Sequence, residues 1–109
     1  MSDSFETTWN KKEFKAYTLL YCSQADLSES NAERGVIVKK VGKENYNHIY
    51  TEIEKDNDYT RIQKIISSAN RLDYNHEKLL KDMKEVFFSD GEFDEIEKGI
   101  FILLKKLLK

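Results

Sequence analysis

Proline is absent from this chain of 109 residues, and only four glycines occur in it. Proline breaks helices and glycine weakens them, so a chain with so little of either allows long uninterrupted helices. Its turns must then be made by Asn, Asp, Ser and the glycines. Apolar residues recur at spacings of three and four along the whole length, which is the period of an amphipathic helix. The sequence therefore predicts an all-helical protein with short polar connections.

Six principal helices follow from the apolar spacing and from the signals that start a helix. The clearest start is at Asn10, where Glu13 completes a capping box. Trp9 and Phe14 stand on either side of that cap, at the two positions of a hydrophobic staple. Asn75 is the predicted N-cap of the fifth helix. The expected helices span residues 10–25, 30–41, 43–55, 58–72, 75–89 and 94–108.

The last predicted helix, 94–108, is apolar around most of its circumference. A helix of that kind normally lies in the centre of a bundle, and we expect it there. Residues 1–8 show no matching pattern and are expected to form a mobile tail. Residues 9–109 then form a single domain, since domains commonly contain about 100 to 150 residues.

The composition restricts where the chain works and what it binds. Hydrophobic residues make up 39% and charged residues 35%, which is too apolar for a disordered chain. No stretch approaches the ~20 apolar residues that span a bilayer, and the N-terminus lacks the pattern of a signal peptide. We therefore expect a cytoplasmic protein without membrane insertion. The net charge of −2 offers no broad footprint for nucleic acid, so the expected partner is another protein.

Catalytic signals are weak. Cys22 is the single cysteine, which excludes an internal disulfide framework, and His48 and His76 lack the companions of a zinc finger. Cys22 follows a run of apolar residues and is expected to be a buried thiol. His48 is expected to face water or a groove. No triad or paired-carboxylate pattern stands out, so we predict a protein that is not an enzyme.

Two turns share one pattern at a separation of 64 residues. The stretches SQADLSESNAERGVIV, 23–38, and FFSDGEFDEIEKGIFI, 87–102, each end a helix, turn at an Asp, and begin a helix that carries a Glu. So many matches without a gap predict a duplicated helix-turn-helix unit. The matched pairs are Asp26 and Asp90, Ser30 and Asp94, Glu33 and Glu97, Arg34 and Lys98, and Gly35 and Gly99.

The paired glycines fall in the first turns of their helices. There Gly35 and Gly99 each weaken the helix by about 1 kcal/mol relative to alanine. We expect a compensating reason, namely close approach of another backbone where the two related helices cross.

The second turn, SDGEFDEIE, resembles the signature of the tellurite-resistance TerB-like family, in which an Asp-Gly step precedes an apolar residue, an N-cap and a Glu. That family includes the N-terminal helical domain of DjlA-type membrane co-chaperones. The first turn, ADLSESNAE, is similar to a degraded form of the signature, with Leu27 in place of the glycine. The resemblance covers residues 14–108 and implies a compact helical bundle of two similar halves.

The TerB-like resemblance also implies a function. Its members are considered non-enzymatic binding or scaffold modules of stress-related bacterial systems. A divalent cation proposed at their acidic turns would fall here on Asp26, Glu33, Asp90 and Glu97. Ca²⁺ or Mg²⁺ is the expected ion, since carboxylates favour these hard cations over zinc.

The residues themselves leave three interpretations of the acidic turns open. Glu33 and Glu97 each stand three residues after a small polar residue, where a carboxylate caps a helix start. A cation would need several oxygens from both sides of a turn. Val86 and Phe88 occupy the places of the first EF-hand ligands, which excludes an ordinary EF-hand but not a looser site shared by both turns. An acidic protein-docking patch is the third interpretation.

Lysines gather at related ends of two predicted helices. Cations there complement the negative helix termini, so we expect solvated helix ends rather than a phosphate site. The six tyrosines are expected in the core and at its half-buried rim; several exposed together would indicate a protein-binding groove. The lysines are Lys39, Lys40, Lys43, Lys105, Lys106 and Lys109.

The sequence therefore predicts a TerB-like binding or scaffold protein with a weak divalent-cation site. The first alternative is a metal-independent adaptor whose acidic turns are helix caps and docking charges. The second, from another class, is a small metal-dependent hydrolase. A monomer and a homodimer are both compatible with the sequence.

Overall fold

Six α-helices make up the part of the chain that the computed structural model describes, residues 7–24, 31–72, 76–88 and 95–107. No strand occurs in these ranges. Each predicted helix is confirmed, with both of its ends within one residue of the expected position. The helices are α1 (Lys11–Gln24), α2 (Asn31–Val41), α3 (Lys43–Lys55), α4 (Asp58–Leu72), α5 (His76–Phe88) and α6 (Glu95–Leu107).

Helix α1 begins with the predicted capping box. The backbone N–H of Glu13 donates to Asn10 Oδ1 over 2.8 Å, and the backbone N–H of Asn10 donates to Glu13 Oε1 over 3.0 Å. Trp9 and Phe14 are both buried, as a hydrophobic staple requires. The Trp9 ring also lies 4.5 Å, centroid to centroid, from the ring of Tyr17. The start of α1 is thus fixed by the two interactions that the sequence predicted.

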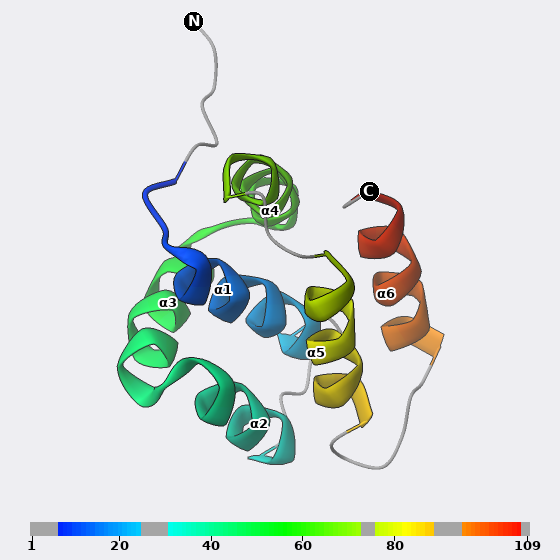
Figure 1. Cartoon of the computed structure of the whole chain (residues 1–109), viewed down its shortest axis with the longest axis horizontal. Helices are drawn as coiled ribbons and strands as arrows, with labels where there is room; N and C mark the ends of the chain where they lie inside the picture. Colours follow the sequence, from blue (N-terminus) through cyan, green and yellow to red (C-terminus); the bar gives the residue numbers. More distant parts are fainter. Residues whose placement is uncertain (1–6, 25–30, 73–75, 89–94, 108–109) are drawn as a thin grey trace, which may run out of the picture.

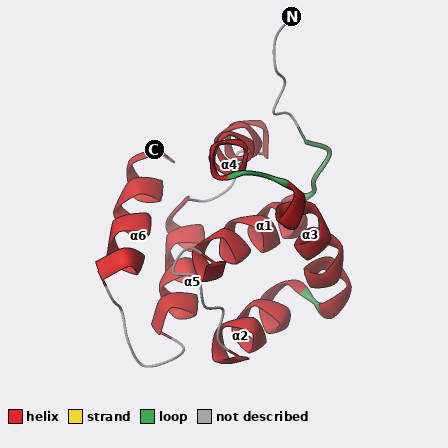
Figure 2. Cartoon of the chain, turned by 180° about the vertical axis from the view of Figure 1, so that it is seen from behind, coloured by secondary structure: helices red, strands yellow, loops and turns green. Residues whose placement is uncertain are grey.

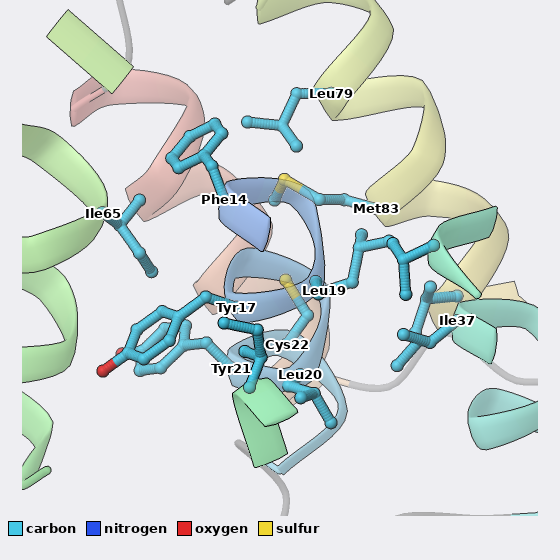
Figure 3. Close-up of a cluster of buried hydrophobic side chains, with 14 of the residues drawn as sticks. Phe14, Tyr17, Leu19, Leu20, Tyr21, Cys22, Ile37, Ile65, Leu79 and Met83 are labelled. Atoms are coloured by element: carbon cyan, nitrogen blue, oxygen red, sulfur yellow. The ribbon is translucent and has the colours of Figure 1, made fainter. Parts of the chain in front are cut away.

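Helix α1 is the centre of the fold, because it contacts each of the other five helices. Figure 1 shows it lying across the middle of the molecule. Residues 16–23 are buried without a break, so α1 is covered on every side. Its side chains meet Ile37 of α2, Ile65 of α4 and Leu79 of α5 in a single core (Figure 3).

The expectation that the last helix is central was wrong. Helix α6 lies at the edge of the molecule beyond α5 in both views (Figures 1 and 2) and packs on α5 and α1. Leu104 is buried, but Ile102 keeps 62% of its surface exposed and Leu103 37%. The physical reason is charge: α6 carries Glu and Lys near its start and Lys near its end, whereas residues 16–24 of α1 contain no charged side chain.

Two tight joints connect α2, α3 and α4. Gly42 ends α2 and begins α3, with φ of +88°, a conformation that glycine adopts without strain. Its N–H donates to the Val38 carbonyl over 2.7 Å. Asn57 caps α4 by accepting from the Thr60 N–H at 2.8 Å, which confirms the predicted break near residues 56–58. Arg61 closes the same joint by donating to the Ile53 carbonyl over 2.8 Å.

The expected close approach at the paired glycines was also wrong. A Cβ added at Gly35 or Gly99 would meet no atom of the described residues within 4 Å. Both glycines lie on exposed helix surface, and α2 and α6 do not cross there. No contact within the described part of the chain therefore offsets the helix stability that these two glycines cost.

Residues 1–6 of the predicted tail lie outside the described residues, but its end is tied to the fold. The Thr7 hydroxyl lies 2.7 Å from Ser68 Oγ on α4. One guanidinium nitrogen of Arg71 donates to the Trp9 carbonyl over 2.5 Å. Among the described helices, none is long and apolar enough to cross a membrane.

Two glycine substitutions should change stability in opposite directions. Gly35→Ala should raise the free energy of unfolding by about 0.5 to 1 kcal/mol, because alanine favours the helix and the site is open. Gly42→Ala should lower it by about 1 kcal/mol, because a Cβ is strained at that positive φ. Urea denaturation of the two variants and the wild type measures both effects. A destabilised Gly35→Ala protein would show that Gly35 is contacted by residues outside the described ranges.

Candidate functional site

The four predicted metal ligands are only partly within the described structure. Asp26 and Asp90 lie outside the described residues, and Glu97 belongs to α6 but its side chain is not described. The side chain of Glu33, in the first turn of α2, is buried. Among the described residues, no group of three or more His, Cys, Asp and Glu side chains is arranged to hold a metal ion. The cation site, the capping roles and the docking patch all stay predictions.

Cys22 and His48 lie where the sequence predicted them. Cys22 is 1% exposed within the α1 core, which confirms the predicted buried thiol. The His48 side chain is 65% exposed, as expected, and its Nε2 lies 3.6 Å from Glu13 Oε2. The His76 side chain is outside the described residues.

A buried ionic cluster joins α1, α2 and α5; we call it the Asp82 cluster. Asp82 is 6% exposed. Its two carboxylate oxygens each lie 3.0 Å from an ammonium group, Oδ2 from Lys15 and Oδ1 from Lys40. Lys40 also lies 3.0 Å from Glu85 Oε2. The expectation that Lys40 is a solvated helix end was therefore wrong: its side chain reaches across to α5 rather than into water.

Pairing favours the charged forms of Asp82 and Lys40. Burial disfavours the carboxylate of Asp82, but hydrogen bonds from Lys40 and Lys15 outweigh this effect and lower its pKa. Burial likewise disfavours the charged form of Lys40, while its hydrogen bonds to Asp82 and Glu85 raise its pKa. Acid-base catalysis needs a group that titrates near the working pH. The pKa values of Asp82 and Lys40 are both displaced away from neutrality, so the cluster is suited to holding three helices together.

A second polar cluster joins α1, α3 and α4 through two tyrosines. The Tyr17 hydroxyl donates to Asp56 Oδ2 over 2.6 Å, and the Tyr21 hydroxyl donates to Asp58 Oδ1 over 3.2 Å. Burial raises the pKa of both tyrosines, and the neighbouring carboxylates raise it further. Both hydroxyls therefore remain protonated donors. The side chains lie next to each other at the α4 side of α1 (Figure 3).

Lys64 of α4 completes this second cluster. Its ammonium lies 2.8 Å from Asp56 Oδ2 and 3.2 Å from Glu52 Oε2, and 6.0 Å from the centre of the Tyr17 ring. Glu52 in turn accepts from Trp9 Nε1 over 3.2 Å. Every charge in the group has a specific partner, so this cluster also serves to position helices.

A surface hollow between α5 and α6 has a different character; we call it the α5–α6 hollow. It has a volume of about 260 Å³. Its apolar part comes from one residue of each helix, and three exposed lysines and one glutamate surround that part. The Lys84 ammonium lies 5.3 Å from the centre of the Phe101 ring. The lining residues are Glu77, Leu80, Lys81, Lys84, Phe101 and Lys105.

Phe101 is held in the α5–α6 hollow by the core. Its ring meets that of Phe87 edge to face, with centroids 6.5 Å apart. Phe87 is fully buried, so the apolar base of the hollow rests on rigid packing. Lys105 was predicted only as a helix-end cation. One signal in the sequence could have indicated the hollow. Intervals of four and three separate Glu77, Lys81 and Lys84, which places these residues on one face of α5.

A second hollow, of about 350 Å³, lies between α2 and α3. Arg34 Nε donates to the Tyr46 hydroxyl over 3.1 Å, and the Tyr46 and Tyr50 rings lie 5.8 Å apart. Asn47 and Thr51 complete the lining. Two of the six tyrosines therefore share a hollow, but Tyr46 is itself buried, and its hydroxyl is already occupied by Arg34. The α5–α6 hollow, with exposed charge beside apolar surface, is the stronger binding candidate.

Asp82→Asn should strongly destabilise the fold. The substitution removes the buried carboxylate that both Lys15 and Lys40 contact, and the loss of one partner from such a buried ionic group costs about 3 kcal/mol or more. Glu85→Gln is the matched control, because its side chain is 51% exposed and should contribute no more than about 1 kcal/mol. Urea denaturation at pH 7 compares the three proteins. Equal losses for the two variants would contradict the assigned role of Asp82.

The same comparison has a defined pH dependence. The pKa of Asp82 is lowered by folding, so its carboxylate stabilises the fold above the ordinary carboxyl pKa, near 4. That contribution is lost as the pH falls through the lowered value. The difference between wild type and Asp82→Asn should thus be constant from about pH 5 to 7 and shrink below about pH 4.

Comparison with family models, with curated proteins and with solved structures finds no match to this chain. The TerB-like resemblance therefore stays a prediction that rests on the two acidic turns.

Proposed function

We propose that this chain is a non-enzymatic binding or scaffold module, and that its α5–α6 hollow receives an acidic, partly apolar segment of a partner protein. The observation that carries the proposal is the composition of that hollow. Leu80 and Phe101 offer apolar surface, while Lys81, Lys84 and Lys105 surround it with exposed positive charge. A ligand must be complementary both to this apolar surface and to the positive charge around it. Purely apolar and purely basic segments are therefore excluded.

The charges of the hollow favour one orientation of the partner. Lysines outnumber the single acidic lining residue, Glu77, although the chain as a whole carries a net charge of −2. Complementary charge accelerates the encounter and fixes the register of a bound segment. Lysine stems can also lie along an apolar ligand while their ammonium groups stay hydrated. Glu77 disfavours acidic groups at its own end of the hollow.

A binding role is also supported by what the polar clusters do. The Asp82 cluster and the Tyr17–Asp56 pair are used to hold helices against one another. The pKa of Tyr17 is raised and the pKa of Asp82 is lowered, so both are displaced away from neutrality. The lysines that line the α5–α6 hollow are exposed and take no part in these two clusters, so they are available for recognition.

The proposal includes the two-half architecture implied by the TerB-like resemblance. Shifting α1 and α2 by 64 positions brings them close to the bounds of α5 and α6. Four of the five buried positions of α5 also fall on buried positions of α1 under this shift, in keeping with the proposed repeat, whereas the buried Tyr17 and Leu20 of α1 correspond to the exposed Lys81 and Lys84. The buried pairs are Thr18 and Asp82, Leu19 and Met83, Cys22 and Val86, and Ser23 and Phe87.

An amide-shift titration tests the binding role. The probe is a synthetic peptide of about 15 residues in which Glu and Leu recur at helical spacing. We expect the largest shifts at Leu80, Lys81, Lys84, Phe101 and Lys105, and weaker binding as salt is raised. A peptide with the same Leu positions and Lys in place of Glu should not bind.

Charge reversal gives the matched variants. Lys81→Glu with Lys84→Glu should weaken binding of the acidic peptide by about tenfold or more, because it reverses the charge around Phe101. Lys39→Glu with Lys43→Glu makes the same change in net charge at exposed sites away from the hollow, and should leave binding within about twofold. Equal weakening by both pairs, or shifts on another surface, would reject this site.

A further inference from the structure

Helix α6 presents a second face to solvent, made by residues other than the Phe101 and Lys105 that line the α5–α6 hollow. Ile102 on this face is 62% exposed, and the Glu95 side chain is 94% exposed. Gly99 lies between them, with no described atom within 4 Å of the place a Cβ would take. Lys106 is exposed one turn beyond Ile102. Leu103 and Leu107 flank the stripe with 37% and 38% of their surfaces exposed.

The spacing of this face is that of a helix-pairing seam. Glu95, Gly99, Ile102 and Lys106 are separated by four, three and four residues, the alternation that keeps a stripe on one side of a helix. The buried residue Leu104 lies on the other side, toward α5 and α1. The stripe is thus acidic at its start, basic at its end, and small and apolar in the middle.

We propose that this face pairs with the same face of a second copy of the chain, with the two α6 helices antiparallel across a two-fold axis. The pairs Glu95 with Lys106 and Gly99 with Ile102 share one midpoint, between residues 100 and 101. A two-fold axis through that midpoint sets Glu95 against Lys106 of the second copy. It also sets the Ile102 side chain over the Gly99 surface of the second copy. Both contacts occur twice, as such symmetry requires.

Charge selects the antiparallel arrangement. A parallel pair would place Glu95 against Glu95 and Lys106 against Lys106, which repel. The antiparallel pair brings opposite charges together and also opposes the two helix dipoles favourably. Within its own helix Glu95 lies 3.8 Å from Lys98, a long contact for an ion pair, so its carboxylate can turn toward a partner. The stripe is therefore complementary to itself.

The antiparallel dimer gives Gly99 a structural role. Gly99 weakens α6 and contacts no described atom at its Cβ position. Across a dimer axis, the missing side chain would make room for Ile102 of the second copy and let the two backbones approach closely. The interface is one helix wide, smaller than the about 800 Å² per partner of stable complexes. We therefore expect a weak dimer, with Kd between about 10 μM and 1 mM.

Sedimentation equilibrium of the full chain up to about 1 mM tests the dimer. The wild type should self-associate in the expected range. Ile102→Ser should raise Kd by about tenfold or more, since it removes the central apolar contact. Gly99→Ala should also raise Kd while making the monomer more resistant to urea, a combination that loss of folding cannot produce. Tyr59→Ser, at a comparably exposed site on α4, should leave the Kd of self-association unchanged.

Charge exchange tests the orientation. Glu95→Lys alone and Lys106→Glu alone should each weaken self-association, while the double variant restores it, because the opposite pairs are re-formed only across an antiparallel axis. A wild type that is monomeric at 1 mM would overturn the proposal. So would self-association that Ile102→Ser and Gly99→Ala leave unchanged, since the dimer would then use another surface. A double variant no better than the single ones would reject the antiparallel axis.

Discussion

All-round burial of α1 is the constraint on which the rest of the structure depends. Residues 16–23 have no solvent-facing side, so each of the other helices must cover part of α1. Polar side chains of α1 in or beside this stretch can then pair with groups on those helices. Lys15 meets Asp82 of α5, and Tyr17 meets Asp56 at the end of α3. The core and the polar clusters are thus one system, in which the central helix determines where charge can be buried.

The position of α6 follows from the same constraint. Because α1 occupies the centre, the last helix packs on α5 and α1 with one side and leaves the other side to solvent. The packed side contributes Phe101 to the α5–α6 hollow. The open side carries Gly99 and Ile102. A peripheral helix with two usable faces can hold a partner on one face and a second copy on the other, which a central helix cannot do.

Local structure was predictable here because it is encoded locally. The capping box of Asn10 and Glu13, the staple of Trp9 and the breaks between helices depend on residues a few positions apart. The order of the helices in space is not encoded in that way. Apolar periodicity made the last helix look central, whereas the better signal was the charge-free stretch 16–24 of α1. The bond between Lys40 and Asp82 spans 42 positions, so helical spacing gives no sign of it. The hollow likewise needs α5 and α6 side by side before its lysines form one site.

The chemistry of the described surface separates stability from recognition. The buried carboxylate of Asp82 is paired with Lys15 and Lys40, and these pairings lower its pKa. Exposed lysines around the α5–α6 hollow are not needed to hold the core, so they can change without loss of the fold. The lysines of the hollow can therefore be matched to a partner without any change in the packing of α1. This separation agrees with the proposed binding role, because the surface of the hollow can vary while the helices stay in place.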